Sequence, residues 1–140
     1  MWRNADTIER WVFAMLPSLV TTLGNDYWHT VLDSDEPWLV DFYAPWCGHC
    51  VQFSPVFEQI AKVRMVLDGK VKLGKVDCDQ WPGVCRGAQV QSYPTIRFYK
   101  GQHDGRQQGV RGLQLQSQNK DEIVRLVLEQ VEMLSGHDEL

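Results

Sequence analysis

The run Trp-Leu-Val-Asp-Phe-Tyr at residues 38–43 constrains the fold more than any other part of the sequence. It is of strand length and almost entirely apolar, which is typical of a central strand covered on both faces. Asp41 is its one charged residue. After a short turn, the tetrapeptide Cys-Gly-His-Cys at 47–50 opens a helical pattern. The sequence therefore predicts an α/β domain with two cysteines where a buried strand runs into a helix.

Hydrophobic periodicity predicts alternating helices and strands along the rest of the chain. Helical spacing occurs at residues 5–16, 24–32, 51–69, 82–88 and 121–134, and strand patterns occur at 18–22, 38–43, 71–76, 95–99 and 110–115. The last two strands are expected to form a hairpin. This order predicts a central mixed β-sheet flanked by helices, with an extra N-terminal helix. Pro55 is expected to kink the long helix, because proline removes a backbone hydrogen bond.

Composition narrows the class of protein. The chain has 140 residues, 44% of them hydrophobic, which fits one compact domain. Its 14 basic and 18 acidic side chains give a formal net charge of −4, and the basic ones are scattered. This pattern argues against a nucleic acid partner. No apolar stretch approaches the roughly 18–20 residues of a membrane-spanning helix, so no membrane span is expected.

Cys47 and Cys50 are spaced for a thiol pair. Residues three apart in the first helical turn share a face, so the two sulfurs can approach bonding distance. Cys47 lies where unpaired N–H groups and the helix dipole stabilise a thiolate, the attacking species in disulfide exchange. Cys50 lies one turn deeper, so we expect it to be shielded and to resolve a mixed disulfide. His49 can add positive charge or a hydrogen bond beside the thiolate. A structural disulfide or half of a zinc site has the same spacing.

Three motifs carry a resemblance to a known family: VDFYAPWCGHC at 40–50, VDC at 76–78 and SYPT at 92–95. Together they resemble a thioredoxin-fold domain of the protein disulfide isomerase family, over about residues 18–134. The resemblance implies a thiol-disulfide oxidoreductase that reduces, oxidises or isomerises protein disulfides during folding in the secretory pathway. Its active site is the dithiol of Cys47 and Cys50 with Gly48 and His49 between them. The resemblance implies no cofactor beyond this redox-active pair, and no metal.

A narrower resemblance concerns one branch of that family. The N-terminal helix, the sequence Met-Leu-Pro at 15–17 and the C-terminal tail resemble the last thioredoxin domain of the DnaJ-type disulfide reductases. Those domains more often have proline where this chain has His49. The tetrapeptide CGHC is instead typical of oxidising and isomerising members, so the sequence leaves the direction of electron flow open.

The resemblance also implies roles for residues around the thiol pair. A lone carboxylate in an apolar strand should have a raised pKa, and the family places its buried acid at Asp41, as a general base for Cys50. A partly exposed edge residue with a structural hydrogen bond is the alternative. The resemblance further implies a cis peptide before Pro94 and a shallow apolar groove of Trp46 and Tyr93 that binds unfolded segments. The alternatives are a trans proline at a strand start and aromatic rings that cap the core.

The remaining cysteines, Cys78 and Cys85, have the spacing of a disulfide found in some domains of the family. The resemblance therefore implies a structural disulfide, with a second redox-active pair as the alternative. A zinc site of all four cysteines is disfavoured, because the spacing is not that of paired zinc ligands. Gln118 occupies the position where family domains often have an arginine that tunes the deeper cysteine. Arg111 takes that role only if the preceding loop is rearranged.

The two ends of the chain suggest where it acts. The terminal His137-Asp138-Glu139-Leu140 reads as a retention signal, which implies the endoplasmic reticulum lumen and the retention receptor as a partner. Acidic residues and Pro17 make the start a poor signal peptide, so we expect a longer precursor. The expected division is a helix or linker at 1–16, the thioredoxin domain at 17–134 and the tail at 135–140.

Two functional hypotheses follow from these residues. In the first, the chain is an enzyme that acts on cysteine-containing unfolded or misfolded client proteins, and glutathione or another oxidoreductase is its redox partner. In the second, it is a client-binding module whose redox activity is incidental. Replacement of Cys50 distinguishes them, because only the enzyme should then trap mixed disulfides with clients.

Overall fold

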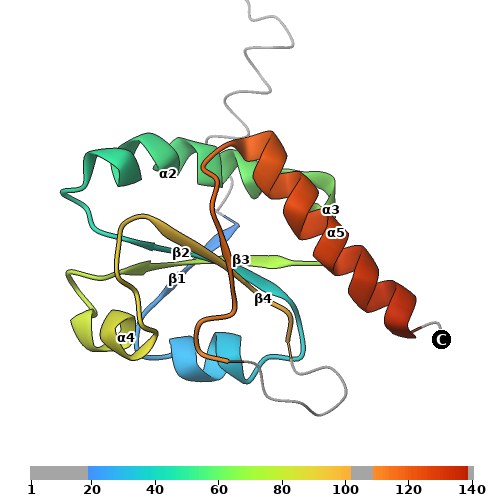
Figure 1. The fold of residues 1–140 in the computed structure, drawn as a ribbon, viewed down its shortest axis with the longest axis horizontal. Helices are drawn as coiled ribbons and strands as arrows, with labels where there is room; N and C mark the ends of the chain where they lie inside the picture. The colour runs from blue at the N-terminus through green and yellow to red at the C-terminus, as the bar shows by residue number, and fades with distance from the viewer. Residues whose placement is uncertain (1–18, 102–108, 139–140) are drawn as a thin grey trace, which may run out of the picture.

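The computed structural model describes residues 19–101 and 109–138 of the chain (Figure 1). The helix expected at residues 5–16 and the last two residues of the retention signal lie outside these ranges. Among the described residues, no helix is long and apolar enough to cross a membrane.

A mixed five-stranded sheet forms the centre of the described chain (Figure 1). Its strands are β1 (Val20–Leu23), β2 (Trp38–Tyr43), β3 (Lys72–Asp77), β4 (Thr95–Tyr99) and β5 (Leu113–Leu115). They lie in the order β1-β3-β2-β4-β5, in which β3 is parallel to both of its neighbours and β4 is antiparallel to both of its own. The predicted mixed sheet with its hairpin is confirmed. β2 is the middle strand, as its apolar run predicted.

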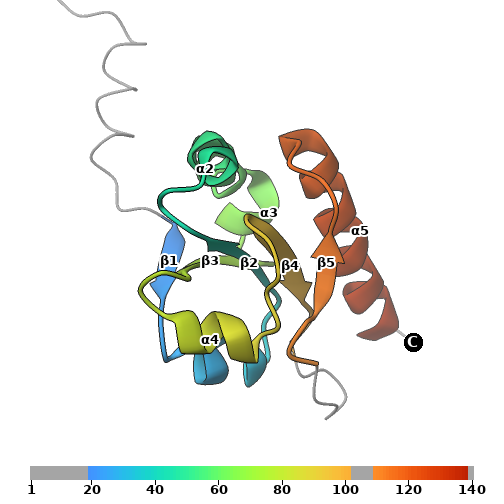
Figure 2. The ribbon, with the colours of Figure 1, turned by 60° about the vertical axis from the view of Figure 1, so that its left-hand side comes forward.

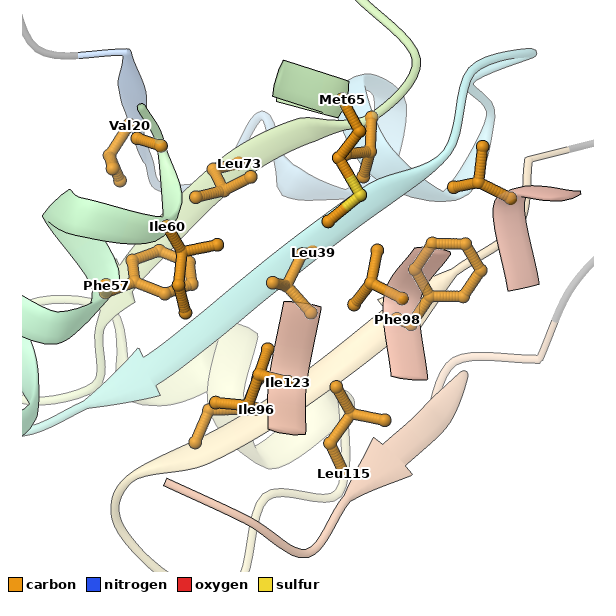
Figure 3. Close-up of a cluster of buried hydrophobic side chains, with 14 of the residues drawn as sticks. Val20, Leu39, Phe57, Ile60, Met65, Leu73, Ile96, Phe98, Leu115 and Ile123 are labelled. Atoms are coloured by element: carbon orange, nitrogen blue, oxygen red, sulfur yellow. The ribbon is translucent and has the colours of Figure 1, made fainter. Parts of the chain in front are cut away.

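Helices cover both faces of this sheet (Figure 2). One face carries α2 (Gly48–Ile60), α3 (Arg64–Leu67) and α5 (Lys120–Asp138), and the other carries the π-helix η1 (Trp28–Leu32) and α4 (Pro82–Gly87). Successive β2 residues therefore belong to different cores. Leu39 packs in the cluster with Phe57 and Ile123 (Figure 3), whereas Val40 and Phe42 pack in the cluster on the other face.

The prediction of one long helix over residues 51–69 is wrong. α2 ends at Ile60, and α3 starts only at Arg64. Between them, the N–H of Val63 donates to the carbonyl of Ile60, and Val63 has an extended backbone (φ −77°, ψ 162°). After this break, Met65 packs in the hydrophobic core between the sheet and the helices on that face. The apolar spacing thus predicted which side chains are buried, but it did not predict the turn that interrupts the helix. Pro55 lies within α2, which continues past it.

Two other predicted elements are shorter than expected. The helix predicted at 24–32 begins only at Trp28, because the Asp26 carboxylate accepts the N–H of Gly24 and holds a turn there. The strand predicted at 110–115 is reduced to β5, because Gly112 has a φ of +55°, which is incompatible with a strand. By contrast, α5 continues past residue 134 into the segment assigned to the tail, since no proline interrupts it.

Gly112 provides a test of this turn. A Cβ there would lie 2.7 Å from the carbonyl oxygen of Phe98 in a left-handed backbone, so Gly112→Ala should destabilise the protein by about 1–3 kcal/mol. Gly109→Ala is the matched control, because a Cβ at Gly109 would meet no atom of the described residues within 4 Å. Urea unfolding measures both variants. Equal stabilities of the two variants would contradict the role given to Gly112.

Candidate active site

The junction between β2 and α2 places Cys47 and Cys50 in one helical turn. After β2 ends at Tyr43, the N–H of Cys47 donates to the carbonyl of Ala44 at 3.1 Å. Cys47 is the N-cap of α2, with an extended backbone (φ −79°, ψ 122°), and its Sγ accepts the backbone N–H of Cys50 at 3.4 Å. The described structure holds both as free thiols. The two sulfur-bearing side chains are therefore adjacent at the helix N-terminus.

The environment of Cys47 favours its thiolate. Hydrogen bonds from the Cys50 thiol and from the backbone N–H groups of Cys50 and His49 lower the pKa of Cys47, because each stabilises the anion. Its side chain is partly exposed, so a partner sulfur can reach it. His49 acts here through its backbone N–H, whereas the sequence pointed to its imidazole.

Cys50 has the opposite environment. Its side chain is buried at 4% exposure. Burial, with smaller contributions from the neighbouring Cys47 and Asp41, raises the pKa of the Cys50 thiol to about 12. One cysteine of the pair is thus accessible and acidic, and the other is shielded and protonated.

Asp41 lies on the same face of β2 as Leu39, beneath α2. Its side chain is 4% exposed, and within the described residues its Oδ1 has no hydrogen-bond partner. Burial raises the pKa of Asp41 to about 7, while Lys75, its register partner on β3, opposes that shift. A cavity of about 370 Å³ is lined by Asp41, Cys50, Lys75 and Glu58, among others. The carboxyl group and the buried thiol therefore share one space, and Asp41 is not an exposed edge residue.

Trp46, Tyr93 and Pro94 border the exposed side of the thiol pair. The Tyr93–Pro94 peptide bond is cis, and the Cys47 thiol donates to the Tyr93 carbonyl at 3.7 Å. The Trp46 ring is 69% exposed and meets the Tyr93 ring edge-on, with centroids 6.0 Å apart. The indole N–H of Trp46 donates to the Asp79 carboxylate at 3.0 Å. An exposed aromatic surface thus adjoins the accessible sulfur.

The other residues singled out in the sequence lie elsewhere. Cys78 and Cys85 form a disulfide between the end of β3 and α4, and both are buried. Arg111 donates to the Gln89 side chain at 3.5 Å and does not line the cavity around Cys50. Gln118 is exposed.

Three residues of this region were not identified from the sequence: Lys75, Asp79 and Arg97. Arg97 is buried on β4, where its guanidinium donates to the carbonyls of Ala88 and Gln89. A charge inside an apolar strand was the available signal for Arg97, as it was for Asp41. No local pattern reveals Asp79, because its partner Trp46 lies 33 residues earlier.

Comparisons with known proteins agree with this geometry. The family model described as Thioredoxin matches residues 18–126. DnaJ homolog subfamily C member 10 from Homo sapiens is 35% identical over 133 residues, which cover 94% of this chain and 16% of that protein. Protein disulfide-isomerase tigA from Aspergillus niger is 36% identical over 91 residues, covering 65% of this chain and 25% of that protein.

Among solved structures, the Trx4 domain of ERdj5 superposes with a TM-score of 0.68 at 32% identity, covering 84% of this chain and 99% of that domain. ERdj5 form II gives a TM-score of 0.74 at 30% identity and covers 96% of this chain but 18% of its own. The chain thus spans about a sixth of the length of the DnaJ relatives that it matches.

The raised pKa of Asp41 predicts a pH-dependent stability. An unfolded aspartate ionises near pH 3.9, whereas folded Asp41 keeps its proton to about pH 7. Between these values the unfolded chain binds fewer protons, so this group lowers the stability as the pH rises and the loss is complete above pH 7. Asp41→Asn should therefore raise the free energy of unfolding at pH 8 by about 2–4 kcal/mol and change it little at pH 4.

Urea unfolding between pH 4 and pH 9 measures this difference. Asp35→Asn is the control, because Asp35 is exposed. A gain for Asp41→Asn that is constant across the pH range would mean that the pKa of Asp41 is the same in the folded and unfolded states, against a raised pKa.

Proposed function

Because this chain belongs to the thioredoxin family, we propose that it is a thiol-disulfide oxidoreductase with Cys47 as its nucleophile and Cys50 as its resolving thiol. One observation carries the proposal: the two thiols are adjacent but oppositely tuned. The accessible Cys47 has a lowered pKa and the buried Cys50 a raised one. A structural disulfide needs no such asymmetry between its sulfurs, whereas two-step exchange does.

In the reducing direction, the Cys47 thiolate attacks one sulfur of a client disulfide. A bond forms between Cys47 Sγ and that sulfur, and the other client sulfur leaves as a thiolate. Cys50 then loses its proton and attacks Cys47 Sγ, which releases the second client thiolate and leaves a Cys47–Cys50 disulfide. The client gains the two electrons that the dithiol loses. The reverse sequence oxidises a client dithiol, and glutathione or another oxidoreductase resets the pair.

Asp41 is proposed as the proton acceptor for Cys50. A carboxyl group whose pKa is about 7 is present in both protonation states at neutral pH, so it can accept the thiol proton in one direction and return it in the other. The cavity shared by the two groups supports this role. Lys75, beside Asp41 on β3, favours the ionised carboxylate that accepts the proton.

Trp46, Tyr93 and Pro94 are proposed as the contact surface for clients. The exposed Trp46 ring offers an apolar surface to residues that flank a client cysteine, and Tyr93 holds its edge. Unfolded or misfolded proteins expose such apolar residues, which fits clients of this kind. We place the activity in the endoplasmic reticulum lumen, on the resemblance to the disulfide isomerase family. The Cys78–Cys85 disulfide is assigned a structural role, since both residues are buried.

Cys50→Ala should accumulate covalent mixed disulfides between Cys47 and client proteins, because the second attack is lost while the first remains. Non-reducing electrophoresis and mass spectrometry measure the trapped species. Cys47→Ala is the control and should trap nothing, since it lacks the nucleophile. Client binding without any trapped species in Cys50→Ala would instead favour a binding module with incidental redox activity.

The direction of the reaction depends on the reduction potential of the Cys47–Cys50 pair. We expect a value near about −180 mV, which suits oxidation and isomerisation, because CGHC is the pattern of those members. A value near about −270 mV would assign a reductase instead. Titration in glutathione buffers, with alkylation and mass spectrometry, reports each cysteine separately. Cys78 and Cys85 should stay oxidised throughout, and their reduction in the same window would contradict their structural role.

A further inference from the structure

Trp46 is held by two residues that flank α4 along the chain. Asp79, before α4, accepts the indole N–H. Tyr93, after α4, packs edge-on with the same ring, with centroids 6.0 Å apart. Because the Trp46 ring is 69% exposed, packing in the core does not fix its orientation. The position of the ring therefore depends on how firmly the chain on each side of α4 is held.

The segment before α4 is tied to the sheet and to the helix itself. Cys78 is bonded to Cys85 on α4, and its N–H donates to the carbonyl of Tyr43 at the end of β2 at 2.8 Å. The Asp77 carboxylate accepts the N–H of Asp79 at 2.9 Å. Asp79 directly follows the disulfide, so this covalent tie fixes the base of the carboxylate that holds Trp46.

The segment after α4 is tied to β4. The buried guanidinium of Arg97 donates to the carbonyls of Ala88 and Gln89, where the chain turns with a Gln89 φ of 62°. That turn leads into the loop that carries Tyr93. Both supports of the Trp46 ring thus come from one small unit, residues 78–93. In it, a disulfide ties the segment before α4 to the helix, and a buried arginine binds the turn after the helix.

We propose that Asp79 and the Cys78–Cys85 disulfide form a positioning unit that holds Trp46 ready for the apolar residues flanking a client cysteine. The proposal rests on the function proposed above and adds a determinant of client specificity to it. Neither Asp79 nor the disulfide takes part in the hydrogen bonds that shift the pKa values of Cys47 and Cys50. The unit should therefore control binding of protein clients and leave the reactivity of the thiols toward small disulfides unchanged.

The first test compares a protein disulfide with a small one. Asp79→Ala should raise KM for insulin about threefold to tenfold at unchanged kcat, the loss typical of one hydrogen bond, and leave the rate with oxidised glutathione unchanged. Asp79→Asn keeps an acceptor oxygen and should restore most of the insulin KM. Gln80→Ala is the matched control, because this exposed neighbour donates its backbone N–H to Asp77 and its side chain makes no hydrogen bond within the described part of the chain.

The second test observes the ring directly. In a nitrogen-proton correlation spectrum, the indole signal of Trp46, identified by its absence in Trp46→Phe, should shift in Asp79→Ala and return toward the parent position in Asp79→Asn. In Cys78→Ala/Cys85→Ala the same signal should shift, and adding Asp79→Ala there should raise KM for insulin less than it does in the parent. If the double variant does not fold, the Asp79 pair still decides the role of Asp79.

Three results would overturn the proposal. If Asp79→Ala leaves both the indole signal and the KM for insulin unchanged, Asp79 does not position Trp46. Equal losses with insulin and oxidised glutathione would place Asp79 in the thiol chemistry or in general stability. Additive effects of the disulfide and Asp79 would show that they act independently. Failure of the parent chain with both substrates would instead reject the proposed function itself, so the two failures are distinguishable.

Discussion

The burial of β2 on both faces is the constraint on which the rest of this structure depends. Its side chains alternate between two cores, with Leu39 in the cluster beneath α2 and α5 and Phe42 in the cluster beside η1 and α4. A strand held in this way has a fixed direction and a fixed end. The helix that begins after it is therefore fixed as well, and Cys47 lies at its N-terminus because the strand ends at Tyr43.

The same burial separates the chemistry of the two thiols. The first turn of α2 leaves Cys47 at the surface and turns Cys50 toward the sheet, where burial raises its pKa. Asp41 reaches this space because it shares a face of β2 with Leu39. An apolar strand thus places a buried carboxyl group where the proposed reaction needs a proton acceptor. Its ionisation lowers the stability of the fold, a loss that a neutral side chain would avoid.

Elements on the opposite face of the sheet hold the residues at the exposed side of the site. There, α4 lies between the end of β3 and the loop before β4. A disulfide ties Cys85 of this helix to Cys78, and a buried arginine binds the turn that follows the helix. Trp46 contacts residues from both sides of this unit. In the proposed mechanism, α2 and β2 determine the reactivity of the thiols, whereas the unit around α4 determines which client residues bind beside them.

Local pattern in the sequence determined the element types, the middle strand, the cysteine pair at a helix start and the anomaly of Asp41, because each depends on residues close together in the chain. Tertiary structure alone decided the break at Val63, the pairing of Asp41 with Lys75 and the bond between Trp46 and Asp79. Periodicity reports which side chains are buried but not where the backbone turns between them. Register and long-range contacts depend on the order of strands in the sheet, which no single segment encodes.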